Sequence, residues 1–107
     1  RNLDNEYDLL IYVANWPEPR SLAWRTLLQA RAIENQCYVV GVNRIGMDDK
    51  SISYTGNSVV IDPKGEIIST LKANQDGTET ITLSFAELEE YRKNFPRERV
   101  KGTYWRR

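Results

Sequence analysis

Two nearly continuous apolar runs on either side of one helical segment constrain this chain more than any other feature. The runs, Tyr7–Asn15 (YDLLIYVAN) and Cys37–Asn43 (CYVVGVN), are rich in β-branched and aromatic residues, a composition that favours strands. Between them, a helical periodicity extends from Ser21, the expected N-cap, to about Gln36. Strands with little polar alternation are typical of sheets that are covered on both faces. The pattern therefore predicts a β-α-β unit within an α/β fold.

The rest of the chain predicts shorter elements. We expect, in chain order, a polar loop (44–57), a strand (Ser58–Asp62), a tight turn (62–65), its hairpin partner (Glu66–Thr70), a half-exposed strand (Glu79–Leu83) and a helix from Phe85 to about Asn94, capped by Ser84 and ended by Pro96. One long and one short helix cannot cover both faces of a buried sheet. The sequence thus predicts half of a larger sandwich.

The residues offer little catalytic chemistry of their own. The chain has no histidine, and its single cysteine, Cys37, opens a buried strand, where a thiol more often acts as a small hydrophobe than as a nucleophile. We expect no metal, because there is no second cysteine and Asp48 and Asp49 lack a spaced set of ligands. We also expect no cofactor, and the isolated glycines of the chain form no phosphate-binding pattern. We therefore predict no catalytic residue in this chain.

Charge is balanced overall but not along the chain. Lysine plus arginine equals aspartate plus glutamate, 15 each, whereas residues 92–107 carry seven basic side chains and one acidic one. A basic arm over 95–107 could touch phosphate, but we favour an arm that is solvated or crosses to another subunit. We accordingly expect no nucleic-acid partner.

Membrane and export signals are not visible. The longest apolar run, Leu9 to Ala14, is far too short to span a bilayer. A lone cysteine excludes an internal disulfide and fits a reducing compartment, so we expect a cytoplasmic protein with no membrane partner. Because the first residue is Arg and not Met, we expect that something precedes it.

Three blocks of the sequence resemble a known family. YDLLIYVANWPEPR, AWRTLLQARAIENQCYVVGVNRIG and YTGNSVVIDPKGEI are similar, in order and spacing, to the later half of the nitrilase superfamily, the carbon–nitrogen hydrolases. The omega-amidase branch is the most similar, and YRKNFPRERV resembles its ending. The resemblance implies that residues 1–107 are the C-terminal portion of one domain, an α-β-β-α sandwich.

The resemblance also implies a reaction. Family members hydrolyse amides or nitriles with a Glu-Lys-Cys triad through a thioester, and omega-amidases act on small dicarboxylic monoamides. All three triad members precede the block with which this chain begins. Cys37 does not fall at the nucleophile's position, so the chain alone is expected to be inactive.

In the resembling enzymes, the loop after the first strand borders the substrate pocket. By this resemblance Asn15 and Trp16 would line the acyl side of the substrate pocket, and Pro17 would fix the corner of this loop. Arg20 would meet the distal carboxylate of the substrate. The alternative is that Trp16 caps the core and Arg20 pairs with Glu18 or solvent.

A second set of residues would support this loop. Arg31 shares a helical face with Trp24 and Leu28, and a buried arginine needs partners, which Glu34 and Asn35 could supply. We favour a buried support network of Arg31, Glu34 and Asn35 over a catalytic role.

An alternative function stays open, a non-catalytic assembly or dimerisation module. The expected partners are the upstream half of the same protein, an amide substrate, and a second copy bound through the sandwich face and the C-terminal arm.

Overall fold

The computed structural model describes residues 2, 4–47, 49–50, 52–56, 58–70 and 79–96. The basic arm predicted over 95–107 lies outside this part of the chain except for its first two residues, and so does Asp48. The elements are β1 (Leu9–Ala14), the 3-10 helix η1 (Glu18–Arg20), α1 (Ser21–Asn35), β2 (Tyr38–Asn43), β3 (Ile45–Met47), β4 (Ser53–Thr55), β5 (Val59–Ile61) and α2 (Phe85–Asn94).

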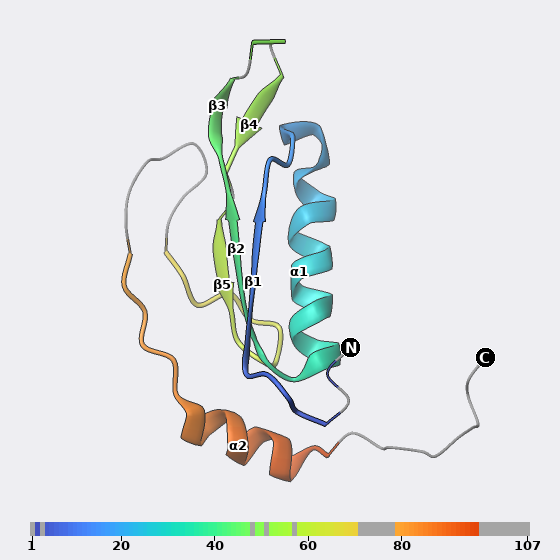
Figure 1. Cartoon of the computed structure of the whole chain (residues 1–107), viewed down its shortest axis with the longest axis vertical. Coiled ribbons are helices and arrows are strands. Elements are labelled where there is room, and N and C mark those ends of the chain that lie inside the picture. Colours follow the sequence, from blue (N-terminus) through green and yellow to red (C-terminus); the bar gives the residue numbers. More distant parts are fainter. Residues whose placement is uncertain are drawn as a thin grey trace, which may run out of the picture.

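The central sheet has the strand order β1-β2-β5. β1 and β2 are parallel, from Leu9 opposite Tyr38 to Ala14 opposite Asn43, and α1 makes the crossover between them along one face (Figure 1). β5 is antiparallel to β2. We call the end at Ala14 and Asn43 the carboxyl edge of the sheet, and the end at Leu9 and Tyr38 its amino edge.

The core lies between α1 and the sheet. Trp24, Leu28 and Ala32 recur at the spacing of one helical face, and all three are buried against residues of the sheet. Gly41 allows this close approach, since an added Cβ would lie 2.5 Å from Leu28 Cδ1 and 3.0 Å from Trp24 Cζ2. The β-α-β unit is therefore confirmed, and its helix fits closely on the strands.

The other face of the sheet is largely uncovered. Along β1 the exposed fraction rises from 40% at Leu9 to 61% at Ile11 and 79% at Val13, and Val42 on β2 is 42% exposed. Burial on both faces, as the apolar runs predict, is not reached among the residues that the structure describes. Its own helices cover one face and the amino edge, so the uncovered apolar surface lies toward the carboxyl edge.

Polar side chains tie α2 to the amino edge. The Arg92 guanidinium donates to Asp8 Oδ1, Tyr7 O and Gln36 O, each at 2.9 Å, and its side chain is only 10% exposed. Gln36 Nε2 donates to Phe95 O at 2.7 Å. Arg92 is therefore a structural clamp and not part of a solvated arm.

Several local predictions differ from the structure. Residues 44–57 were expected to be a loop but contain the strands β3 and β4, which pair antiparallel from Ile45 opposite Thr55 to Met47 opposite Ser53. Residues 79–83 form no strand, and the expected partner of β5 is reduced to one bridge, Ile61 to Ile67.

The helix ends follow the sequence more closely. Ser84 Oγ caps α2 by accepting from Glu87 N at 3.0 Å, as predicted. Ser21 is not the N-cap of α1, which is Arg20, because the Ser21 hydroxyl donates to Glu18 O within η1. α1 ends at Asn35 with Gln36 in the left-handed region at φ 48°.

Candidate functional site

The carboxyl edge of β1 and β2 brings together the residues that were predicted to bind substrate. Asn15 and Pro17 follow β1 directly, and Arg20 closes the 3-10 turn by donating its N–H to Pro17 O at 3.1 Å. Asn15 and Arg20 are exposed. Ligands of open α/β sheets bind outside the carboxyl ends of parallel strands. This segment, residues 15–20, which we call the corner, therefore lies where this topology places a binding site.

Trp16 is held from both sides. Its ring centroid lies 5.6 Å from that of Trp24, in the core, and Arg20 Cζ lies 5.2 Å from the centroid over the ring. The indole N–H donates to Arg20 O. Trp16 thus extends the core, as the alternative interpretation expected, while the guanidinium of Arg20 stacks on it. A fixed ring under an exposed arginine also suits a pocket wall, so the substrate-binding roles of both residues stay a prediction.

Asn43 is a residue of this corner that the sequence analysis did not single out. Its Oδ1 accepts from Trp16 N at 2.7 Å, and its Nδ2 donates to Trp16 O at 2.9 Å. Ser58 Oγ accepts from Asn43 N at 2.9 Å and donates to Asn43 O at 3.2 Å. The available signal was an asparagine at the end of each parallel strand, because asparagine is depleted in strands.

The predicted support network has another location and fewer members. Arg31 and Glu34 form an exposed ion pair, Nη1 to Oε2 at 3.5 Å, with side chains 44% and 45% exposed. Asn35 is buried, accepts from Asn2 N at 2.9 Å and donates to Arg31 O at 3.0 Å. Asn35 lies at the amino edge, since α1 runs back from the corner (Figure 1). The expectation of a buried Arg31–Glu34 network under the loop was wrong, because Trp24, Leu28 and Ala32 take the buried face of α1.

Cys37 is fully buried in the core cluster next to the amino edge. Its burial agrees with the prediction of a small packed side chain. Among the described residues, no group of three His, Cys, Asp or Glu side chains could hold a metal ion. In the same part of the chain, no helix is long and apolar enough to cross a membrane.

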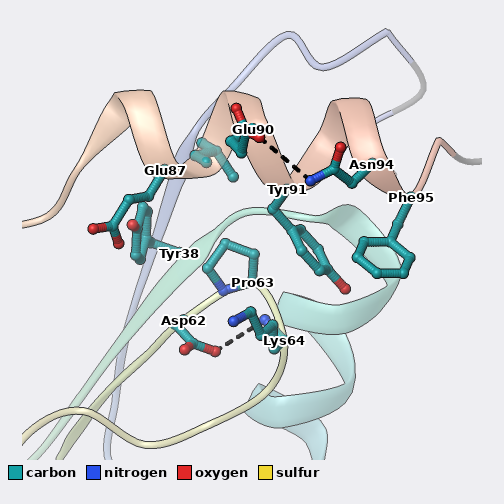
Figure 2. A pocket seen from close by; sticks show the side chains of 10 residues that line it. Tyr38, Asp62, Pro63, Lys64, Glu87, Glu90, Tyr91, Asn94 and Phe95 are labelled. Carbon is teal, nitrogen blue, oxygen red and sulfur yellow. Dashed lines mark hydrogen bonds between the residues drawn. The ribbon is translucent and has the colours of Figure 1, made fainter.

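A cavity of about 330 Å³ lies at the opposite end of the molecule from this corner. Figure 2 shows α2 over the turn at Asp62–Lys64, with Tyr91 directed toward that turn. Glu87 and Glu90 are exposed on its rim. None of the predicted substrate-binding residues lines this cavity.

Comparison with known proteins identifies the family. The profile of the carbon–nitrogen hydrolases matches residues 4–93. The chain belongs to the carbon–nitrogen hydrolase family. It is 58% identical over 96 residues to the omega-amidase YafV of Escherichia coli K12, which covers 90% of this chain and 37% of that protein. It is also 35% identical to the 2-oxoglutaramate amidase of Bacillus subtilis, over 83% of this chain and 34% of that one.

Solved structures of the carbon–nitrogen hydrolase superfamily share the fold. XC1258 of Xanthomonas campestris, a superfamily protein with an arsenic adduct in its active site, matches with a TM-score of 0.82 and 47% identity, over 85% of this chain and 34% of that one. Nit3 of Saccharomyces cerevisiae, a member of branch 10 of the nitrilase superfamily, matches with a TM-score of 0.68 and 27% identity, over 82% and 32%. The chain thus spans about a third of the length of the relatives that it matches. The predicted family, its omega-amidase-like branch and the α/β fold class are confirmed.

Proposed function

We propose that this chain is the C-terminal portion of an amidase that hydrolyses the C–N bond of a small dicarboxylic monoamide, such as the amide of an α-keto acid. The observation that carries the proposal is the 58% identity to an omega-amidase over 90% of the chain. The exposed Arg20 at the carboxyl edge supports the substrate class, because a guanidinium can bind a carboxylate through two parallel hydrogen bonds.

The reacting groups of the proposed enzyme lie outside this chain. A cysteine thiolate would attack the amide carbon, a glutamate would pass the thiol proton to the leaving nitrogen, and a lysine would stabilise the tetrahedral oxyanion. Breaking the C–N bond would release ammonia and leave a thioester, which water would hydrolyse to the acid. Cys37 takes no part in this scheme, because it is buried directly before Tyr38, at the edge opposite the corner.

This chain would contribute one wall of the pocket. Trp16, fixed between Trp24 and Arg20, would present a rigid apolar edge to the carbon chain of the substrate, with Asn15 and Pro17 beside it. Arg20 would hold the distal carboxylate and so align the amide with the nucleophile. Orientation of this kind accounts for a large part of the rate in intramolecular reactions.

The proposal is tested by measuring ammonia release by the full-length protein. The paired substrates are a dicarboxylic monoamide and a monoamide of equal length that ends in a methyl group. We expect hydrolysis of the first with kcat/KM at least about 10-fold above the second, the worth of one charge-assisted contact. Residues 1–107 alone should release none. Equal rates on both amides would refute the substrate class, and turnover by residues 1–107 alone would refute the missing triad.

The uncovered apolar face supports the second function, assembly. Ile11, Val13 and Val42 form a contiguous exposed surface on neighbouring strands, and surfaces of this kind mark interaction sites. We propose that the upstream half of the same protein covers this face and that whole molecules then pair as homo-oligomers in the cytoplasm. The proposal would be contradicted if residues 1–107 were monomeric in analytical ultracentrifugation and also unfolded in a cooperative thermal transition.

A further inference from the structure

We propose that Asn43 is the positioning residue of the substrate-binding corner, setting where Trp16 and, through it, Arg20 are held. The inference rests on the proposed amidase function. Asn43 touches neither substrate nor reacting atoms in this scheme. Its effect passes entirely through the backbone of Trp16.

The hydrogen bonds between the Asn43 side chain and the Trp16 backbone resemble one more pair of backbone bonds between the two strands. The last paired residues of β1 and β2 are Ala14 and Asn43, and Trp16 lies two residues beyond that pair. The amide of Asn43 offers one acceptor and one donor, as a peptide group does, and uses them on the N–H and the C=O of Trp16 at 2.7 and 2.9 Å. The side chain thus continues the pairing beyond the end of the strand.

Asn43 is itself anchored on its other side. The Ser58 hydroxyl accepts from its N–H and donates to its C=O, which joins the segment before β5 to the end of β2. The connection therefore runs from Ser58 through Asn43 to the backbone of Trp16. Two strands of the sheet, and not the loop alone, determine the place of the corner.

The position of Trp16 also determines that of Arg20. The indole N–H donates to Arg20 O, and the guanidinium stacks over the ring with Cζ 5.2 Å from the centroid. Losing the Asn43 amide frees two backbone groups of Trp16, and the ring and the arginine above it can then shift together. A misplacement of about 1 Å can cost on the order of 100-fold in rate.

The amino edge offers a matched control. The side chain of Asn35 also makes two hydrogen bonds to backbone groups. Its Oδ1 accepts from Asn2 N, and its Nδ2 donates to Arg31 O. It is 3% exposed and lies at the end of α1 away from the corner. Removing its side chain deletes the same kind of bonds without touching Trp16.

The experiment compares Asn43→Ala, Asn43→Asp and Asn35→Ala in the full-length protein. Each variant is assayed for kcat and KM on the dicarboxylic monoamide and on its methyl-ended analogue, and for Tm. We expect Asn43→Ala to lower kcat/KM on the dicarboxylic amide by about 10- to 100-fold, with a smaller loss on the analogue. Asn43→Asp keeps the acceptor for Trp16 N and loses the donor to Trp16 O, so its kcat/KM on the dicarboxylic amide should lie between those of the wild type and Asn43→Ala. Asn35→Ala should lower Tm and leave kcat/KM within about 2-fold.

Three outcomes would overturn the inference. The first is a lower Tm in the Asn43 variants with no change in kcat/KM. The second is a fall in kcat/KM of Asn35→Ala as large as that of Asn43→Ala. The third is an equal fall in kcat/KM of Asn43→Ala on both amides. If Asn43→Ala does not fold, Asn43→Asp decides by the same criteria. A wild-type protein that hydrolyses neither amide refutes the proposed function. An active wild-type protein whose Asn43 variants have the same kcat/KM refutes only the positioning role.

Discussion

The two ends of the parallel strand pair use polar residues in opposite ways. At the amino edge Asn2, Asn35 and Gln36 are 0%, 3% and 6% exposed, and they bond to the chain itself. At the carboxyl edge Asn15 and Arg20 are exposed. The first arrangement commits its donors and acceptors to folding, and the second leaves polar groups within reach of a ligand.

The difference follows from what each edge must hold. Three segments converge at the amino edge, namely the residues before β1, the end of α1 and α2, and buried backbone groups there need partners. At the carboxyl edge the loop from β1 into α1 meets the end of β2 and the segment before β5, and the Asn43 side chain fixes the backbone of this loop at Trp16 while leaving Asn15 and Arg20 exposed. Stability is thus expected to depend on the amino edge, and substrate binding on the carboxyl edge.

The largest effect is expected at the amino edge, from Arg92→Met in the full-length protein. The variant keeps most of the apolar stem but removes donors to Asp8 Oδ1, Tyr7 O and Gln36 O. Hydrogen bonds from a charged group contribute about 1.5–3 kcal/mol, and the 48% exposure of Asp8 places the expected loss near the middle of that range. Urea unfolding measures it.

Lys93→Met is the control for this variant, because Lys93 is the next residue on α2 and is exposed. It should change the free energy of unfolding by less than about 0.5 kcal/mol. Equal effects of the two variants would show that α2 is not clamped by Arg92. A fall in kcat for Arg92→Met at full occupancy of the native state would break the division between the two edges.

The next effect is expected from Cys37→Ala. Cys37 is fully buried in the core, so the variant loses packing of a small side chain, about 1 kcal/mol. Because the thiol lies near the amino edge, kcat on the dicarboxylic amide should not change. Turnover abolished in a folded variant, as judged by circular dichroism, would mean that Cys37 is chemically involved.

Much of the fold was predictable because the hydrophobic pattern is strong where the elements are long. The β-α-β unit, α2 with its Ser84 cap and the turn at 62–65, closed by Gly65 N to Asp62 O at 2.9 Å, follow from periodicity and turn chemistry. The β3–β4 hairpin was missed, because strands of three residues carry too few positions to show alternation.

The site was less predictable, for reasons of geometry. A helical wheel places Arg31 near Leu27 and Leu28, but the true buried face is centred on Trp24, Leu28 and Ala32, which turns Arg31 toward solvent. Asn43 and Trp16 are 27 residues apart. Their pairing depends on the register of β1 against β2, which a single sequence does not state.

A smaller effect on stability is expected from Trp16→Phe at the carboxyl edge. Phenylalanine keeps a ring between Trp24 and Arg20 but cannot donate to Arg20 O, a loss of about 1 kcal/mol or less. We expect the preference for the dicarboxylic amide over its methyl-ended analogue to fall more than stability does. Trp24→Phe should show the reverse, since Trp24 is 4% exposed in the core. If the two variants lost stability and substrate preference in the same proportion, Trp16 would have only a packing role.

The smallest change in stability, and the sharpest change in specificity, is expected from Arg20→Lys. Lysine keeps the charge but loses the planar group that stacks on Trp16 and can grip a carboxylate with two parallel bonds. Because Arg20 is exposed, the free energy of unfolding should change by less than about 0.5 kcal/mol. KM for the dicarboxylic amide should rise about 10-fold, the worth of one charged hydrogen bond, while KM for the analogue stays constant. Arg25→Lys, at an exposed arginine on α1, should change neither value. An unchanged KM in Arg20→Lys would remove Arg20 from the pocket and leave the corner without a partner for the distal carboxylate among the residues predicted from this chain.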